Sequence, residues 1–300
     1  MICALIGTSK FAEVHLNQLI KIGAKELALI SRDIVKSKKI CVKFKKKFPN
    51  IDIYPSKITI LKKKKFDLID ICSAIKIHEK HLSYISGLDS IILVEKPIIS
   101  LLKLKKRYLK FLKNLYAKNA RIIVCYPMIY LSKEFEKIFD TKNKISNFEL
   151  NFSTGGQYKY KYICMDLIPH ALSFIFAYFK KFNFKQKFKI KNIKYSKNIW
   201  STYFIYNKIN FYFNFSENLK KKTSFEIVID NKKIKRFSDF KQNEFVNLLK
   251  YNQKIIKIKN PLNQFFLELK RNKNNSNYFR NNKYLTMLLM KINYRFLFEK

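Results

Sequence analysis

The sequence predicts an α/β domain with a doubly wound parallel sheet, followed by an α+β domain. In the first 126 residues short apolar runs alternate with amphipathic segments, as in a parallel sheet covered by helices on both faces. After about residue 143, aromatic and β-branched runs instead indicate a mostly antiparallel sheet. At about 100–200 residues per domain, a chain of 300 residues fits two domains. We expect them at 1–126 and 127–300, with room for the C-terminal helices to pack back on the first domain.

Each element of the first domain follows from its hydrophobic period. The near-continuous apolar runs predict buried strands at 2–6, 26–31, 66–72, 90–94 and 121–126. Helical spacing of apolar residues predicts helices at 10–22, 33–47, 76–86 and 100–118. Ser100 could cap the last of these helices.

The second domain has fewer clear signals. Aromatic and β-branched runs predict strands at 200–206, 209–215 and 224–229, and helical spacing predicts helices at 161–179, 262–270 and 282–291. The Lys- and Asn-rich stretch 271–283 indicates a loop or a helix end.

The formal net charge of +41 suggests a nucleic-acid or anionic-surface binder when it is taken alone. The excess is spread over both halves, +18 in residues 1–150 and +23 in residues 151–300. Only seven of the 62 basic residues are arginine, the side chain that reads phosphate and guanine in a bidentate way. Lys, Ile, Asn, Phe and Tyr are abundant together, as AT-rich codons would produce. We therefore favour a composition bias on an ordinary enzyme surface, and expect no specific nucleic-acid partner.

The five cysteines include no Cys-x-x-Cys pair, and three of them lie in apolar, strand-like runs. This pattern is typical of reduced, buried thiols and predicts a cytoplasmic protein. The N-terminus lacks the basic region of a signal peptide, and no apolar stretch approaches the about 20 residues needed to cross a bilayer. Four histidines and five cysteines show no metal-ligand spacing, so we expect no metal site and no membrane partner.

A glycine ends the first predicted strand and begins a candidate diphosphate-binding turn. The pattern G-x-G-x-x-G is matched as Gly7, Ser9 and Ala12, where a helix N-terminus would point backbone N–H groups at phosphates. Serine in the second position adds a side chain near the phosphates, although its hydroxyl could donate to them. By itself the pattern fits an ordinary strand–helix connection that binds no ligand about as well as it fits a diphosphate-binding turn. The candidate cofactor-binding residues of this turn are Gly7, Thr8, Ser9, Lys10, Phe11 and Ala12.

The second strand ends at Ser31-Arg32-Asp33. An acidic residue at a strand end of this kind holds the ribose hydroxyls of NAD, whereas Ser31 followed by Arg32 suits the 2′-phosphate of NADP. Ser31 and Arg32 are therefore cofactor candidates, and NADP(H) is favoured over NAD(H). In the alternative interpretation Asp33 is only a helix cap beside a solvated Arg32.

Three further segments carry candidate chemistry. The fourth strand ends in a stretch that runs from Ser73 and Ala74 to His78. The fifth runs into Glu95-Lys96-Pro97, which places Lys96 at the carboxyl end of a parallel strand, where open α/β sheets bind ligands. Downstream, after Gly155-Gly156, Asp166 and His170 are four residues apart, and on a helix they share a face.

Taken together, four segments resemble the Gfo/Idh/MocA family of NAD(P)-dependent oxidoreductases. They are the Gly7–His15 turn, the Ser73–His78 strand exit, Glu95-Lys96-Pro97 and Asp166-x-x-x-His170. Asn260-Pro261-Leu262 resembles a further family feature near the C-terminus. The resemblance implies an N-terminal Rossmann domain and a C-terminal domain with a large open sheet. That sheet often joins subunits, so a homodimer or homotetramer is expected.

The resemblance also implies roles for individual residues. The family exchanges a hydride between nicotinamide and a hydroxyl, ketone or imine carbon of a sugar. By that analogy Lys96 contacts the reacting oxygen and the nicotinamide ribose, His170 is the acid–base, and Asp166 orients His170 or holds substrate. A sugar or nucleotide sugar is the expected substrate, in surface-polysaccharide synthesis. Cofactor contacts carried over at the strand ends are Ser73, Ala74, His78, Glu95, Lys96 and Pro97.

The sequence departs from the family pattern at a few positions. Ser9 stands in place of a glycine, Ala74 in place of a proline, and Pro127 and Ile129 where an Asn and an Arg are common. These departures motivate a second hypothesis, a catalytically inactive cofactor-binding relative that acts as a sensor or partner. A basic nucleic-acid binder is the third hypothesis.

Overall fold

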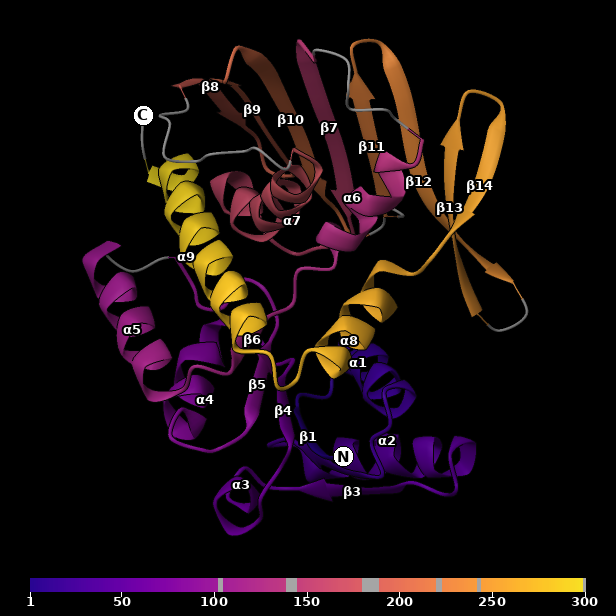
Figure 1. The fold of residues 1–300 in the computed structure, drawn as a ribbon, viewed down its shortest axis with the longest axis vertical. Coiled ribbons are helices and arrows are strands. Elements are labelled where there is room, and N and C mark those ends of the chain that lie inside the picture. The colour runs from indigo at the N-terminus through magenta and orange to yellow at the C-terminus, as the bar shows by residue number, and fades with distance from the viewer. Residues whose placement is uncertain (102–104, 139–144, 180–188, 220–222, 242–243, 299–300) are drawn as a thin grey trace. The chain divides into compact units, whose positions relative to one another are not determined.

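The computed structural model describes residues 1–300 except 102–104, 139–144, 180–188, 220–222, 242–243 and 299–300 (Figure 1). The chain forms two compact units. The first unit consists of Met1–Cys125 and Phe265–Met287, and the second unit of Tyr126–Gln264 and Leu288–Lys300. One unit contains a parallel sheet and the other a mostly antiparallel one, which confirms the predicted fold class.

The first unit is built on a parallel six-stranded sheet in the order β3-β2-β1-β4-β5-β6. Its strands are β1 (Ile2–Ile6), β2 (Glu26–Ile30), β3 (Asp52–Ser56), β4 (Leu68–Ile71), β5 (Ile91–Val94) and β6 (Ile122–Val124). Its helices include α1 (Lys10–Lys21), α2 (Ile34–Lys47), α3 (Ile60–Lys63), α4 (His78–Ile85) and α5 (Lys105–Lys118), with a 3₁₀ turn at Ile75–Ile77.

Two neighbouring strands in the middle of this sheet lead the chain in opposite directions. From β1 it continues to β2, and from β4 it continues to β5. Because crossovers between parallel strands are right-handed, α1 and α4 cover opposite faces, and Figure 1 shows them on the two sides of β4 and β5. The carboxyl ends of β1 and β4 therefore form a switch point, where open α/β sheets bind ligands.

The sequence patterns did not predict β3, an edge strand in which Ile53 is buried while the other residues are partly or fully exposed. Its mixed composition and Pro55 conceal it, because proline is confined to edge strands and bulges. The helix predicted over 100–118 is observed from Lys105 to Lys118, and the first part of the prediction includes 102–104, outside the described residues.

The second unit holds an eight-stranded sheet in the order β14-β13-β12-β11-β7-β10-β9-β8. Its strands are β7 (Asn147–Thr154), β8 (Lys189–Tyr195), β9 (Ile199–Tyr206), β10 (Ile209–Glu217), β11 (Ser224–Ile229), β12 (Lys232–Lys241), β13 (Glu244–Tyr251) and β14 (Lys254–Ile258). All pairs are antiparallel except β7 with β10.

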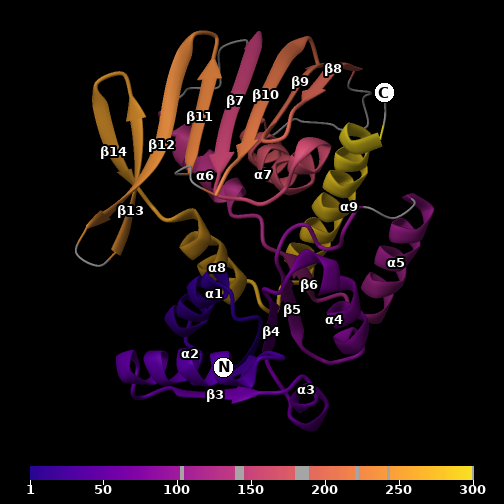
Figure 2. The ribbon, with the colours of Figure 1, turned by 180° about the vertical axis from the view of Figure 1, so that it is seen from behind.

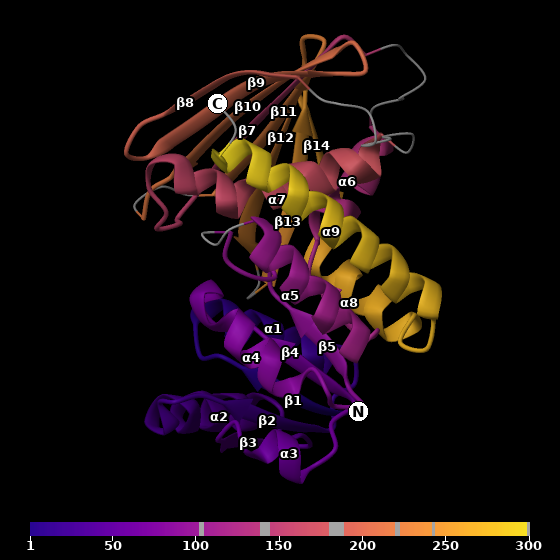
Figure 3. The ribbon, with the colours of Figure 1, turned by 90° about the vertical axis from the view of Figure 1, so that its left-hand side faces the viewer.

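Helices cover one face of this sheet only, as far as the chain is described. The helices α6 (Met128–Glu136) and α7 (Ile163–Tyr178) lie on that face (Figure 2). Alternation along each strand buries one side, so that Phe148, Phe211 and Phe225 form an aromatic core with Phe174 of α7. In the described part of the chain, Figure 3 shows no helix over the opposite face of β7 to β11.

The chain ends in two helices, α8 (Pro261–Arg271) and α9 (Ser276–Phe298). Helix α9 begins in the first unit and ends in the second, and its residues 276–283 are helical where a loop or helix end was predicted. In the first unit Asn282 accepts a hydrogen bond from the Val124 N–H (2.8 Å) and donates one to the Val124 carbonyl (3.0 Å). One side-chain amide thus pairs both backbone groups of Val124 on the edge strand β6.

No helix among the described residues is both long and apolar enough to cross a membrane. The five cysteines, all of which are described, are buried free thiols.

Candidate functional site

The turn after β1 requires glycine and leaves a helix N-terminus accessible. Gly7 has φ +139°, and a Cβ there would lie 2.5 Å from the Cys72 carbonyl oxygen. The Ser9 hydroxyl oxygen caps α1 by accepting the Ala12 N–H at 3.0 Å, and a hydroxyl in this role can still donate its proton. Ser9, Lys10 and Phe11 are exposed. The predicted turn is therefore in place and can present N–H groups to a phosphate.

The end of β2 lies beside this turn. The hydroxyl oxygens of Thr8 and Ser31 are 3.5 Å apart, and Ser31 also accepts the Asp33 N–H at 3.1 Å. Asp33 caps α2 by accepting the Lys36 N–H at 2.9 Å, and Arg32 is exposed. The geometry contains the helix cap of the alternative interpretation and, next to it, a serine and an arginine accessible to a ligand.

At the carboxyl ends of β4 and β5, His78 joins the two predicted strand exits. This buried histidine has Nε2 2.8 Å from the Ser73 carbonyl oxygen and Nδ1 3.2 Å from the Pro97 carbonyl oxygen. Burial lowers its pKa, so the neutral ring donates to one carbonyl at a time. The Ser73 hydroxyl lies 3.0 Å from Nδ1 of His81. Ala74 is exposed and Lys96 is partly buried.

A buried ionic cluster lies next to Lys96, and its central residue had no predicted role. His15 of α1 has Nδ1 2.8 Å from the Asp70 carboxylate and Nε2 3.0 Å from the Glu95 carboxylate. Burial opposes a charge on His15, but the two carboxylates raise its pKa to about 10. His15 and Asp70 are fully buried. The available signal was an aspartate inside an apolar strand, since such a group is buried only with a partner.

Two residues of this cluster, together with Cys125, form a group of potential metal ligands among the described residues. Ligand atoms of His15, Glu95 and Cys125 lie within 4.8 Å of one another. Both nitrogens of His15 already face carboxylates, and burial keeps the pKa of the Cys125 thiol well above its usual value. The arrangement therefore serves as a hydrogen-bonded ion cluster.

In the second unit, Asp166 and His170 lie on α7 as predicted, with Asp166 in the first turn. Both are partly buried. The His170 ring packs edge-on against Phe152 of β7, with 5.6 Å between ring centroids. The Ser173 hydroxyl donates to the His170 carbonyl at 3.0 Å. The packing restricts the ring of His170, a residue that is partly buried.

The loop after β7 brings in two residues that no sequence motif had indicated. The Tyr158 N–H donates to the buried Glu217 carboxylate at 2.7 Å, and a Cβ at Gly156 would overlap that same carboxylate. Burial and the negative charges of Asp166 and Glu217 raise the pKa of Tyr158 to about 12. Tyr158 is therefore a protonated phenol, able to donate a hydrogen bond, in the electrostatic range of Asp166.

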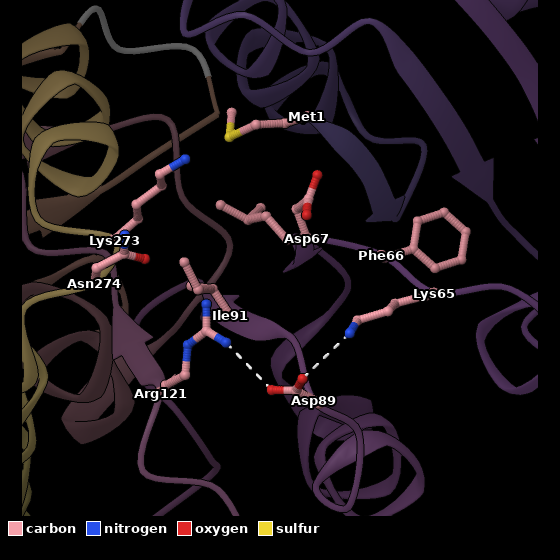
Figure 4. Close-up of a pocket in the computed structure, with 10 residues that line it drawn as sticks. Met1, Lys65, Phe66, Asp67, Asp89, Ile91, Arg121, Lys273 and Asn274 are labelled. Carbon is pink, nitrogen blue, oxygen red and sulfur yellow. Dashed lines mark hydrogen bonds and ion pairs between the residues drawn. The ribbon is translucent and has the colours of Figure 1, made fainter.

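A pocket of about 360 Å³ lies at the amino ends of β4, β5 and β6 in the parallel sheet (Figure 4). It is lined by Met1 and by residues that precede β4, β5 and β6, such as Asp67, Asp89 and Arg121. Asp89 pairs with Arg121 at 3.3 Å and with Lys65 at 3.5 Å. None of the predicted site residues lines this pocket. In the first unit they lie in the turn after β1 and at the carboxyl ends of β2, β4 and β5, whereas Asp166 and His170 lie on α7.

Comparison with known proteins identifies the first domain. Residues 1–127 match the model of the Gfo/Idh/MocA oxidoreductase family, described by its NAD-binding Rossmann fold. The similarity to the Gfo/Idh/MocA family is thus shown for these 127 residues. The match includes the Gly7 turn, the β4 exit and Glu95-Lys96-Pro97, which confirms the resemblance. An oxidoreductase fold that binds a nicotinamide cofactor follows from it.

Solved structures extend the similarity along the chain. A dehydrogenase (MviM) from Clostridium difficile is 14% identical with a TM-score of 0.67, and the match covers 98% of this chain and 97% of that one. KijD10, a 3-ketoreductase from Actinomadura kijaniata in complex with TDP-benzene and NADP, is 9% identical with a TM-score of 0.68, covering 98% and 96%. An oxidoreductase from Agrobacterium radiobacter in complex with NAD+, L-tartaric acid and magnesium is 13% identical with a TM-score of 0.59, covering 96% and 94%.

At these identities the solved structures establish the fold of the whole chain. No curated protein matches its sequence.

Proposed function

We propose that this protein is an NADP(H)-dependent oxidoreductase that acts on a hydroxyl or carbonyl carbon of a sugar or nucleotide sugar. The observation that carries the proposal is the first unit's arrangement, in which the Gly7 turn and the Glu95-Lys96-Pro97 segment meet through His15. A side chain at Gly7 would fill the space of the Cys72 carbonyl, and the α1 N-terminus is accessible. These residues fit a dinucleotide.

The end of β2 supports the choice of NADP(H). Ser31 adds no negative charge, and Arg32 is exposed beside it, so the guanidinium can pair with a 2′-phosphate. The neighbour KijD10 is in complex with NADP, whereas the Agrobacterium oxidoreductase is in complex with NAD+. We therefore base the preference on Arg32.

The proton chemistry is assigned to three side chains. When bound, the nicotinamide supplies or accepts the hydride. Lys96 is proposed to hold the reacting oxygen with its ammonium N–H groups. His170 is proposed to give or take the hydroxyl proton, since an imidazole titrates near neutral pH, and Asp166 to orient it or hold substrate.

The substrate class and the assembly are proposed on separate grounds. A chain of net charge +41 favours an anionic substrate such as a nucleotide sugar, and the structural neighbour KijD10 is a 3-ketoreductase in complex with TDP-benzene. Surface-polysaccharide synthesis is the proposed context. The uncovered sheet face carries a polar ladder in which Tyr203 stacks on Tyr212 and Asn151 donates to Glu149 at 2.8 Å, and we propose that a second copy covers it.

Ligand-induced thermal stabilisation tests the cofactor. We expect NADPH to raise the Tm more than NADH, because a ligand stabilises a protein in proportion to the logarithm of its concentration over Kd. The variant Arg32→Ala should reduce the NADPH shift to the level of NADH. Arg121→Ala is the matched control, because Arg121 pairs with Asp89 at the amino ends of the strands, away from the proposed cofactor site. Equal shifts with both nucleotides in the unmodified protein would contradict the role of Arg32.

Turnover tests the proton chemistry. With a panel of 3-keto nucleotide sugars and NADPH, Lys96→Ala and His170→Ala should each abolish turnover and leave the fold and NADPH binding measurable. Full turnover in either variant would refute the assigned role.

The inactive cofactor-binding relative is the second candidate, and α6 favours it. Pro127 is the N-cap of this helix, its carbonyl accepts the Tyr130 N–H at 3.0 Å, and Ile129 lies in the first turn. Two positions where the family pattern is polar thus hold apolar side chains. NADPH binding without reduction of any substrate in the panel would favour this candidate.

A further inference from the structure

Asp70, His15 and Glu95 form a charged chain beneath the carboxyl ends of β4 and β5. His15 bridges the carboxylates at 2.8 Å and 3.0 Å, and the side-chain exposures are 0% for His15 and Asp70 and 12% for Glu95. The rings of Phe11 and Phe266 pack on His15 with centroids at 4.9 Å and 5.2 Å. The charges of this cluster are therefore shielded from water and act over longer distances than surface charges.

The three side chains carry one excess negative charge whichever of two groups holds the shared proton. With an imidazolium between two carboxylates the sum is minus one. If Asp70 holds the proton and His15 is neutral, Glu95 still carries minus one. Both arrangements place a hydrogen at each of the two contacts of the ring. The excess charge thus does not depend on where that proton lies.

The groups that face the cluster from other elements do not cancel it within the buried space. The Cys72 and Cys125 thiols are neutral, since burial and nearby carboxylates raise their pKa. Two cations among the described residues, His15 and Lys96, lower the pKa of Glu95 by their charge. Lys96 follows Glu95 directly in the chain. The site therefore has a negative charge beneath and a positive charge beside it.

The strand order places these charges on the nicotinamide side of the dinucleotide. The diphosphate turn follows β1, and the Ser31-Arg32 end of β2 is assigned to the adenosine half. The sheet order β2-β1-β4-β5 then leaves the carboxyl ends of β4 and β5 for the other half. Glu95 and Lys96 are the residues at that end of β5.

We propose that the Asp70–His15–Glu95 cluster and Lys96 set the relative affinity of the protein for oxidised and reduced cofactor. The oxidised nicotinamide ring carries a positive charge and the reduced ring is neutral. The excess negative charge of the cluster therefore stabilises the oxidised form selectively, while Lys96 opposes it. This role rests on the proposed cofactor function and adds that Glu95 and Lys96 act on the ratio with opposite signs.

The test measures Kd for NADP+ and for NADPH by calorimetry, without any substrate. Glu95→Gln removes one negative charge at nearly constant size, and should weaken NADP+ relative to NADPH by about fivefold or more, as a charge shielded from water predicts. Lys96→Met removes the positive charge, and should change the ratio by a similar factor in the opposite direction. A role in packing alone would change both affinities equally.

Asn119→Ala is the control for lost stability. Asn119 is buried and donates to the Leu88 and Ser90 carbonyls at 3.0 Å and 3.2 Å, at the opposite edge of the same sheet. Its removal should lower the Tm and leave the ratio unchanged. If Glu95→Gln does not fold, Lys96→Met carries the test, since Lys96 lies outside the buried cluster.

The outcomes separate failure of the charge effect from failure of the cofactor function. If the unmodified protein binds neither nucleotide, the cofactor function itself is refuted, and the charge effect with it. If both nucleotides bind, the charge effect alone is overturned when the ratio of the two Kd values in Lys96→Met, and in any folded Glu95→Gln, stays within a factor of about two of the ratio in the unmodified protein. The test is sensitive, because a tenfold change in this ratio corresponds to only about 1.4 kcal/mol.

Discussion

Asn293 of α9 donates a hydrogen bond from Nδ2 to the backbone carbonyl of Met165 in α7, at 3.2 Å. That carbonyl would otherwise accept the N–H of residue 169, which is a proline and has none. Asn293 is fully buried. Its amide therefore replaces the missing helix hydrogen bond to the Met165 carbonyl, in the turn that carries the proposed site residues Asp166 and His170.

Replacing this amide should destabilise the second unit. We expect Asn293→Leu to lower the free energy of unfolding by about 1–3 kcal/mol, because it leaves a buried carbonyl without a donor. Pro169→Ala restores a backbone N–H at that point, so Asn293→Leu should cost less in the Pro169→Ala background. Urea denaturation of the four proteins measures the coupling. An equal cost in both backgrounds would show that Asn293 contributes through packing.

The bond between Asn293 and Met165 illustrates what the sequence could and could not predict. Apolar periodicity and Gly7 predicted the parallel sheet and its turn, because both signals are local. Asp166 and His170 were expected on one helix, as observed, since four residues make slightly more than one turn. The partner of the Met165 carbonyl is 128 residues away, and no local pattern reports it.

Long-range charge pairing set the same limit at the candidate site. His15 and Asp70 are 55 residues apart, and local patterns placed each of them on an element but indicated no shared role. Glu217 was missed because its carboxylate is needed only where the Gly156 loop folds against it. The edge strand β3 was missed for another reason, since Pro55 and mixed burial obscure its period.

The Gly7 turn should not tolerate a side chain. Gly7→Ala combines a positive φ with a Cβ 2.5 Å from the Cys72 carbonyl oxygen. We expect this variant to lose about 1–3 kcal/mol of its free energy of unfolding, and to lose NADPH binding. Gly87→Ala is the matched control, because a Cβ there meets nothing within 4 Å. It should leave binding unchanged and alter stability by less than about 1 kcal/mol. Thermal unfolding with and without NADPH measures both, and wild-type binding by Gly7→Ala would contradict the turn assignment.

The His15–Glu95 pair predicts a loss of stability in alkali. The folded protein raises the pKa of His15 from 6.5 to about 10, so the stabilisation is complete below about pH 6.5 and is lost as the pH rises through about 10. Glu95 has the opposite sign, because its pKa is lowered and its contribution is lost in acid.

Comparison with Glu95→Gln isolates this effect from the many exposed lysines, which both proteins share. Urea denaturation at neutral pH should show the unmodified protein as the more stable, and the difference should narrow towards about pH 10, where His15 loses its charge. A difference that stays constant over this range would mean that His15 is not charged in the folded protein.

The contact between Gly156 and Glu217 predicts a steric effect that can be separated from a charge effect. Gly156→Ala places a Cβ in the space of the buried Glu217 carboxylate, and we expect a loss of about 1–3 kcal/mol, typical of overpacking. Adding Glu217→Ala should relieve the overlap, so that the double variant is more stable than the two single effects predict. Adding Glu217→Gln keeps the size and should give no relief. Equal behaviour of the Ala and Gln double variants in urea denaturation would show that the Glu217 charge, and not its volume, makes glycine necessary at 156.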